Sequence, residues 1–253
     1  MVDEDFAWRL TQGLVRIDSS DPGAYEDEIE RYIKALVEER LAQLSYPVLD
    51  AVQIAEHEVL PGRRNLMVTV PGQSDEPRLV YICHLDTVTL GDGWDADIPP
   101  LGAIVRNDKL YGRGACDMKG GLACAIAALV HTLERVAAEG ELPHRGFSLI
   151  CSVDEEDFMR GSEAAIDAGW VGSREWVLDT EPTDGQIQAS HVSAVTDAEG
   201  NQTPLPGVGL KLYKVSTVNF DGNVHFMLDS ALASTEEAKD IDFDKLDGSP
   251  AST

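Results

Sequence analysis

Three apolar segments of this chain each lead directly to side chains that can bind a metal ion. Each segment is short and nearly continuous in apolar residues, which is typical of a strand covered on both faces. In an open α/β sheet, ligands collect beyond the carboxyl ends of the strands. The sequence therefore predicts a sheet that gathers these side chains at one edge. The segments are 78–83, followed by His84, 147–153, followed by Glu155 and Glu156, and 176–178, which leads to Glu181.

Segments with a helical spacing of apolar residues alternate with these strands. The clearest is 118–138, where apolar residues recur every three or four positions. Strands that alternate with helices indicate an α/β domain. We therefore predict an α/β fold with a mostly parallel or mixed sheet flanked by helices. The other expected elements are helices at 3–18, 24–44 and 162–168, a strand at 65–70, and a hairpin formed by 102–106 and 109–111.

Asp117 precedes the 118–138 helix within a glycine-rich stretch. Aspartate is a favoured residue at a helix N-terminus, so a capping role is one interpretation. The other is that its two oxygens bridge two metal ions, with the glycines allowing the backbone to approach closely. Gly120 and Gly121 lower the helix propensity of the first turn, which suggests close packing beside a site.

The charge of the chain limits its partners. Lys and Arg number 20 and Asp and Glu number 45, which gives a net charge of −25 over 253 residues. Such a surface disfavours nucleic acid and anionic membranes as partners. Because counterions screen the self-repulsion of an acidic exterior, the composition also suits a high-salt, halophilic cytoplasm. The first five residues carry no basic side chain and no window approaches roughly 20 apolar residues, so we expect a soluble, cytoplasmic protein.

The four cysteines do not form a metal-binding motif. The chain contains no Cys-x-x-Cys pair, which argues against a zinc ribbon. Cys83 and Cys151 lie within apolar segments, and we expect them to be reduced residues of the core. The candidate ligands are therefore histidine and carboxylate side chains.

One imidazole with several carboxylates suits one or two divalent metals and metal-assisted hydrolysis. His84 needs a partner for its second ring nitrogen, and Asp86 is close enough in sequence to supply it. Residues 154–157 crowd four carboxylates together, which costs free energy unless a cation offsets the charge. Simpler interpretations stay open, namely a surface loop for His84 and Asp86 and a solvated acidic turn for 154–157. Asp179 competes with Glu181 as a ligand.

Four motifs together resemble the zinc-dependent acylase and exopeptidase family. This family includes acetylornithine deacetylase, succinyl-diaminopimelate desuccinylase, aminoacylase and carboxypeptidase G. The resemblance covers roughly residues 5–190, and four linked motifs in the matching order are far more specific than any one alone. The motifs are ICHLDTV at 82–88, YGRGACDMKGG at 111–121, DEE at 154–156 and EPT at 181–183.

The resemblance implies a role for each candidate residue. It implies that Glu155 is the general base and that Asp86 orients His84. It also implies two divalent metals, Zn²⁺ or Co²⁺, and a cis peptide bond between Asp117 and Met118. The metal ligands that it implies are His84 and Glu181 on one ion, Glu156 on the other, and Asp117 between them.

The substrates implied by the resemblance are N-acyl amino acids or small peptides with a free carboxylate. An acidic protein needs a local cationic contact for that carboxylate. Arg113, Lys119 and Arg160 lie near the motifs in sequence, and none of them is singled out by the sequence. Lys119 also has a simpler interpretation as a solvated residue at the start of a helix.

The resemblance weakens after residue 188. We predict a partial catalytic domain at 1–188 and a divergent polar tail at 189–253, with a hairpin around 220–223. Family members continue with a lid or dimerisation domain and a final histidine ligand, and neither has a convincing counterpart in the tail. A homodimer built through such a domain is therefore doubtful. His191 and His225 are the only later histidines, and we interpret both as structural.

Two interpretations of different class follow. The chain is either a metal-dependent amide hydrolase with an altered tail, or a truncated or frameshifted remnant that keeps the fold without activity. The intact ligand set before residue 188 favours the hydrolase. A calcium-binding module is a third interpretation, but calcium sites use oxygen donors and His84 argues against it.

Overall fold

The computed structural model describes residues 4–182, 194–196, 202–204, 215–220 and 224–228. The chain forms two units, Met1–Pro182 and Thr183–Thr253. In the second unit, β10 (Ala194–Thr196) pairs antiparallel with β11 (Gln202–Pro204), and β12 (Val215–Phe220) with β13 (Val224–Leu228). The predicted hairpin around 220–223 is therefore confirmed in its two strands. The assignment of 1–188 and 189–253 as separate domains stays a prediction, and His191 lies outside the described residues.

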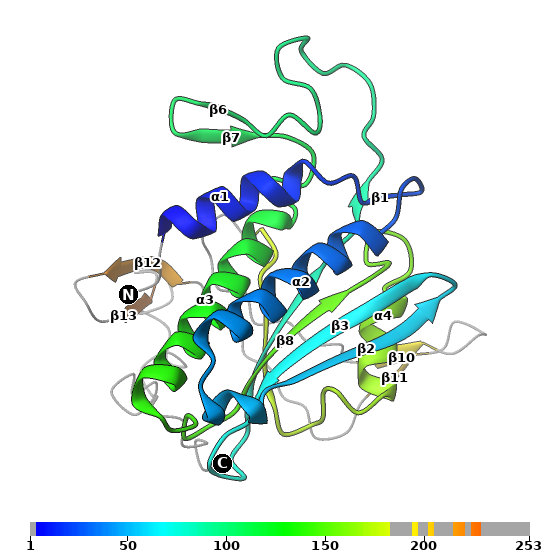
Figure 1. Ribbon diagram of the computed structural model, residues 1–253. Helices are drawn as coiled ribbons and strands as arrows, with labels where there is room; N and C mark the ends of the chain where they lie inside the picture. Colours follow the sequence, from blue (N-terminus) through cyan, green and yellow to red (C-terminus); the bar gives the residue numbers. More distant parts are fainter. Residues whose placement is uncertain (1–3, 183–193, 197–201, 205–214, 221–223, 229–253) are drawn as a thin grey trace. The chain divides into compact units, whose positions relative to one another are not determined.

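The first unit is built on a mixed five-stranded sheet of order β2-β3-β8-β4-β9 (Figure 1). Both pairs that involve β3 are antiparallel, whereas β8, β4 and β9 run parallel. The prediction of a mostly parallel or mixed sheet is confirmed as mixed. The strands are β2 (Gln53–Leu60), β3 (Arg63–Val70), β4 (Leu79–His84), β8 (Phe147–Ser152) and β9 (Trp176–Asp179).

Helices cover both faces of this sheet, as Figure 1 shows. Side chains alternate between the faces of a strand. On β3, Leu66 and Val68 belong to the large core beneath α1–α3, whereas Met67 packs in a smaller core with Ala165 of α4. The helices are α1 (Glu4–Val15), α2 (Asp27–Leu44), α3 (Lys119–Glu139) and α4 (Arg160–Asp167), with a short 3₁₀ helix, η1, at Pro47–Ala51.

The helix α3 is the central element of the large core. It is the one helix in the described part of the chain with the length and hydropathy of a membrane span, a feature that the sequence analysis did not register. Its inner face is packed against the sheet and against α1 and α2, with residues such as Leu122, Ile126 and Leu129 fully buried. The core helix of a soluble protein can have the same length and hydropathy. The helix α3 ends at Glu139 and is capped by Gly140, whose positive φ of 72° closes the last turn.

Some elements were not expected from the sequence. The strand β2 is an edge of the sheet with none of its residues fully buried, and its polar sequence holds no continuous apolar run. A short parallel pair joins β1 (Ser20–Asp21) to β5 (Thr87–Val88) within segments predicted as turn and loop. The predicted hairpin is confirmed as β6 (Ile104–Arg106) and β7 (Lys109–Tyr111). Cys83 and Cys151 are buried free thiols, as predicted.

Candidate metal centre

The three parallel strands end at the same edge of the sheet, and the candidate ligands lie there. His84 is the last residue of β4, Glu155 and Glu156 follow β8, and Glu181 follows β9 by two positions. Asp117 comes from the turn that precedes α3. The gathering of these segments, predicted from the apolar runs, therefore follows from the parallel register of β8, β4 and β9.

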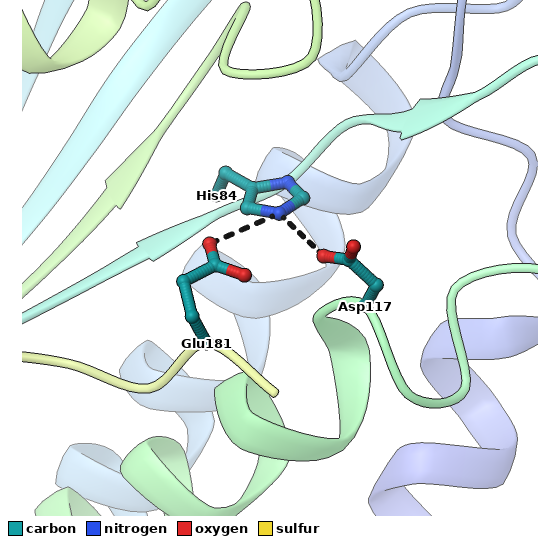
Figure 2. A group of neighbouring side chains, drawn as sticks. All are labelled: His84, Asp117 and Glu181. Carbon is teal, nitrogen blue, oxygen red and sulfur yellow. Dashed lines mark hydrogen bonds and ion pairs between the residues drawn. The ribbon is translucent and has the colours of Figure 1, made fainter. Parts of the chain in front are cut away.

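Three of the candidate ligands surround one point (Figure 2). Nε2 of His84 lies 3.1 Å from Oδ1 of Asp117 and 3.3 Å from Oε1 of Glu181. One donor atom from each of these residues lies within 4.8 Å of the other two. His84 is almost fully buried, whereas the side chain of Asp117 is 56% exposed, so the group opens to solvent on the Asp117 side. Glu155 lies at the edge of the group, with Oε2 3.9 Å from Nε2 of His84.

The second ring nitrogen of His84 is held by the backbone of Asp86. Nδ1 donates to the carbonyl oxygen of Asp86 at 2.9 Å, whereas the carboxylate of Asp86 lies 3.6 Å away, beyond hydrogen-bonding distance. Because a carbonyl oxygen can only accept, Nδ1 carries a proton, and Nε2 is the ring nitrogen left to give up its proton to a metal. Nε2 therefore faces Asp117 and Glu181 as a ligand must.

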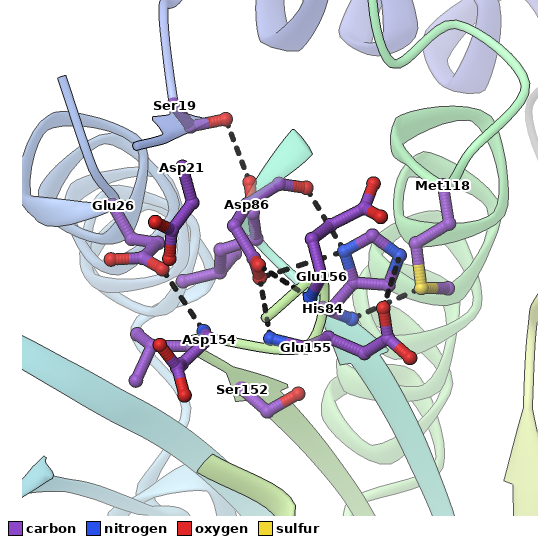
Figure 3. A network of polar contacts seen from close by, with 12 residues as sticks. Ser19, Asp21, Glu26, His84, Asp86, Met118, Ser152, Asp154, Glu155 and Glu156 are labelled. Carbon is purple, nitrogen blue, oxygen red and sulfur yellow. Dashed lines mark hydrogen bonds and ion pairs between the residues drawn. The ribbon is translucent and has the colours of Figure 1, made fainter. Parts of the chain in front are cut away.

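The carboxylate of Asp86 has a different partner, which sequence reasoning missed. Its two oxygens accept the backbone N–H groups of Glu155, at 3.1 Å, and Glu156, at 2.9 Å (Figure 3). These bonds tie the segment after β8 to the segment after β4. Sequence patterns carry no direct signal for a carboxylate that binds backbone amides 69 and 70 positions away.

Glu156 does not belong to the compact group formed by His84, Asp117 and Glu181. Its Oε1 accepts the backbone N–H of Val88 at 3.1 Å. Asp179, the competitor of Glu181, also lies outside the group. The assignment of Glu156 as a ligand stays a prediction.

The electrostatics of the group fit a cation. Burial opposes the charged form of His84, but the surrounding carboxylates, led by Asp86, outweigh it and raise the pKa of His84 to about 10. Burial, with a smaller contribution from the charge of Asp179, raises the pKa of Glu181 to about 7. Burial also raises the pKa of Glu155 and that of Glu156. The negative charge of these carboxylates is not balanced by the one imidazole. A divalent metal ion would balance it, and imidazole and carboxylate groups are suitable ligands for such an ion.

Glycine permits the close packing that brings Glu181 into place. A Cβ atom on Gly121 would lie 2.2 Å from the backbone oxygen of Thr180, which precedes Glu181. A Cβ on Gly120 would lie 2.7 Å from the backbone oxygen of Ala115. The prediction that these glycines allow close packing is confirmed.

The segment before α3 also has the predicted backbone. The peptide bond between Asp117 and Met118 is cis, as the resemblance implied. Met118 caps the start of α3 without a side-chain hydrogen bond. Its sulfur accepts the backbone N–H of His84 at 3.0 Å, which joins this segment to β4.

The interpretation of Lys119 as a solvated residue is wrong. Its side chain is 1% exposed, and Nζ donates to the backbone oxygen of Ile17 at 2.7 Å. Burial lowers its pKa to about 8. The lysine therefore links the start of α3 to the segment that follows α1. It is not solvated because that segment covers it.

The family model described as peptidase family M20/M25/M40 matches residues 80–252, which is more than half of the chain. The chain belongs to this family. The match to the M20/M25/M40 model continues through most of residues 189–253, the segment that the sequence analysis treats as a divergent tail. It gives no support to the interpretation of the chain as an inactive remnant.

Curated proteins similar to this chain include succinyl-diaminopimelate desuccinylases. The succinyl-diaminopimelate desuccinylase of Gluconobacter oxydans (strain 621H) is 37% identical over 115 residues, 44% of this chain and 28% of the relative. The probable succinyl-diaminopimelate desuccinylase of Staphylococcus aureus (strain MRSA252) is 31% identical over 123 residues, 49% of this chain and 29% of the relative. The aligned chain thus spans under a third of the length of either relative.

A solved M20 structure shares the fold. The M20 family metallo-carboxypeptidase from Sulfolobus solfataricus superposes with a TM-score of 0.52 at 22% identity, over 70% of this chain and 37% of that chain. At this level of identity the likeness concerns the fold, an α/β sheet flanked by helices. M20 metallopeptidases use divalent metals, and the group of His84, Asp117 and Glu181 is suited to hold one.

Proposed function

We propose that the chain is a metal-dependent hydrolase that cleaves the amide bond of N-acyl amino acids or small peptides. The observation that carries the proposal is the convergence of His84, Asp117 and Glu181 at the ends of parallel strands, in a chain of the M20/M25/M40 family. The relatives described as desuccinylases support an N-acyl amino acid as the substrate class.

The proposed ligands of two divalent metals, Zn²⁺ or Co²⁺, are His84, Asp117, Glu156 and Glu181. When bound, such metals polarise an amide carbonyl and lower the pKa of a water molecule towards neutrality. His84 contributes Nε2 because its Nδ1 is committed to the carbonyl of Asp86. One carboxylate oxygen of Glu156 accepts the N–H of Val88, which leaves the other oxygen to coordinate a metal.

Glu155 is the proposed general base. Its backbone is fixed by the carboxylate of Asp86, and its Oε2 lies 3.9 Å from Nε2 of His84, so its side chain faces the same space as the ligands. In the reaction, Glu155 accepts a proton from the attacking water and delivers it to the leaving amine. That transfer is needed because an amide nitrogen leaves readily only after protonation.

The substrate carboxylate requires a cationic contact, and Arg113 is the proposed one. Lys119 is buried and bonded to Ile17, and Arg160 forms two hydrogen bonds with Asp154. Among the described residues, Arg113 makes one long hydrogen bond, 3.3 Å, to the backbone of Leu90 and lies over the ring of Trp94, 5.6 Å from its centre. It lines a cavity of about 400 Å³. A cytoplasmic location and a high-salt setting stay predictions from composition.

The proposal is tested by measuring amine release. The purified chain is loaded with Zn²⁺ or Co²⁺ and incubated with N-succinyl-diaminopimelate, N-acetyl-ornithine, simple N-acyl amino acids and dipeptides. We expect turnover of at least one substrate, abolished by a chelator and restored by the metal. Asp117→Ala should lose it by about 10²-fold or more. Asp167→Ala, an exposed aspartate of α4, is the matched control and should keep it. No amine release from any substrate by the metal-loaded chain would overturn the proposal.

A further inference from the structure

A buried arginine lies behind the segment that carries Glu155 and Glu156. Arg63, the first residue of β3, is 8% exposed and contacts carboxylates from two other segments. It donates to Glu26 at 2.7 and 2.5 Å and to Asp21 at 2.6 Å. Its third guanidinium nitrogen lies 3.2 Å from Oδ1 of Asp154, two residues after β8.

Asp154 is held by both its backbone and its side chain. Its N–H donates at 3.0 Å to Glu26, the carboxylate that Arg63 binds in two places (Figure 3 shows the bond from Asp154). Its own carboxylate is bound by Arg63 and by Arg160. Asp154 has a positive φ of 66°, a conformation that L-residues rarely adopt without strong support from their surroundings.

A second residue of β3 forms hydrogen bonds with the same segment after β8. The side chain of Asn65 is fully buried, and its Oδ1 accepts the N–H of Val153 at 3.1 Å. Its Nδ2 donates to the backbone oxygen of Gly161 at 2.7 Å. Arg63 and Asn65 lie two positions apart and so on the same side of the strand, and together they hold both ends of the turn 153–161.

The arginine also balances a group of acids that would otherwise repel one another. Donor oxygens of Asp21, Glu26 and Asp86 lie within 4.8 Å of one another, an arrangement that by itself resembles a metal site. Arg63 already binds two of the three, so the group has its cation. A guanidinium carries several donors in a fixed plane and can bind more than one carboxylate at once, which a lysine ammonium does less well.

We propose that Arg63 is a positioning residue: through Glu26 and Asp154, its guanidinium fixes the turn after β8 so that Glu155 and Glu156 face His84 and Asp117. Asp86 completes the path, because its carboxylate binds the next two backbone amides of the same turn. The catalytic meaning of this role rests on the proposed function, but the placement of the turn does not.

The first test measures the turn without metal or substrate. Amide hydrogen exchange is followed at Glu155 and Glu156 in the wild type, in Arg63→Ala and in Arg63→Lys. We expect exchange at these two amides to be at least about 10-fold faster in Arg63→Ala, with Arg63→Lys intermediate, while the amides of Val68 and Leu149 in the sheet stay protected. Arg145→Ala, which removes an exposed arginine paired with Glu76, is the matched control and should change neither.

The second test asks whether the role extends to the metal and to catalysis. In Arg63→Ala we expect the Kd for Co²⁺ to rise about 10-fold or more and kcat to fall with KM little changed. Guanidinium chloride at about 20 mM, far below denaturing concentrations, should partly restore both, because the free cation fills the space left by the side chain. It should have no such effect on Arg145→Ala.

The outcomes separate the two proposals. A wild type that binds no Co²⁺ contradicts the proposed function, whereas unchanged exchange at Glu155 and Glu156 in Arg63→Ala contradicts the positioning role. If Arg63→Ala does not fold, Asp154→Asn leaves Arg63 paired with Glu26 and should show the same selective loss of protection. Equal protection in Asp154→Asn and in the wild type would then overturn the positioning role, as would exchange that quickens equally throughout the sheet.

Discussion

The backbone oxygen of Thr180 lies where a side chain on Gly121 would have to be. A Cβ atom built on Gly121 would come within 2.2 Å of it. Gly121 belongs to the first turn of α3, close to Asp117, and Thr180 immediately precedes Glu181. The absence of a side chain at one position thus lets two candidate ligands from different segments approach the same imidazole.

Gly121→Ala should therefore displace the candidate ligands, although it adds only one methyl group. Because the added carbon meets backbone rather than a flexible side chain, the segment carrying Glu181 must move. We expect a loss of about 1–3 kcal/mol in the free energy of unfolding and weaker Co²⁺ binding, measured by chemical denaturation and by titration. Gly13→Ala in α1 is the control. Its Cβ meets only the hydroxyl end of Tyr32, which is 40% exposed and can turn away, so stability should hold or rise. Equal effects of the two substitutions would contradict this account.

Glu155→Gln should separate catalysis from metal binding. The amide keeps the size of the side chain and leaves the backbone bond to Asp86 intact, but it cannot accept the proton. We expect kcat to fall by about 10²–10⁴-fold with the metal content unchanged, measured by steady-state kinetics and elemental analysis on the same samples. Glu163→Gln, an exposed glutamate on α4, should leave both values near those of the wild type. Retained turnover in Glu155→Gln would remove Glu155 from the role of general base.

Glu30 should make the stability of the fold depend on pH. Its side chain, on α2, is 1% exposed, and neither carboxylate oxygen has a hydrogen-bond partner in the described part of the chain. Burial, and then the negative charge of Glu56, raise the pKa of Glu30 from 4.5 to about 7. A group whose pKa is raised in the folded state favours folding fully below its unfolded pKa, and that contribution is lost as pH rises through the folded pKa.

Glu30→Gln should therefore be more stable than the wild type at pH 8, by about 1 kcal/mol or more. The advantage should shrink as the pH falls from 8 to 5, where the wild-type carboxyl is protonated in the folded state. Urea denaturation at both pH values measures it. Glu28→Gln, an exposed neighbour on the same helix, should show no such dependence. A wild type as stable as Glu30→Gln at pH 8 would disprove the raised pKa.

The sequence locates the strands that carry the candidate ligands, because each apolar run is followed by charged or imidazole side chains. β8 is buried on both faces and β4 over most of its length, so composition marks them, and the helix after Asp117 is marked by its periodicity. The interpretation of 176–178 as a covered strand is wrong, because β9 is an edge of the sheet and all four of its residues are exposed. β2 gives no such signal because an exposed edge strand needs no apolar run. The cis bond after Asp117 came from the resemblance and from no local pattern.

The contacts between segments are where sequence reasoning falls short. The carboxylate of Asp86 binds backbone amides. Every residue except proline has a backbone amide, so no residue type in the sequence indicates this contact. Lys119 is buried only because the segment around Ile17 covers it, a fact of tertiary packing. Arg63 gave no sign of its role either, because its partners come from segments that are distant in the chain.

The central claim is that His84, Asp117, Glu156 and Glu181 together hold divalent metal. The most direct measurement is the metal content of the chain after extensive dialysis, compared between the wild type and Asp117→Ala. The account predicts about two Zn²⁺ or Co²⁺ ions per wild-type chain and a clear loss in the variant. A wild type that retains no metal, or a variant that retains as much, would contradict it.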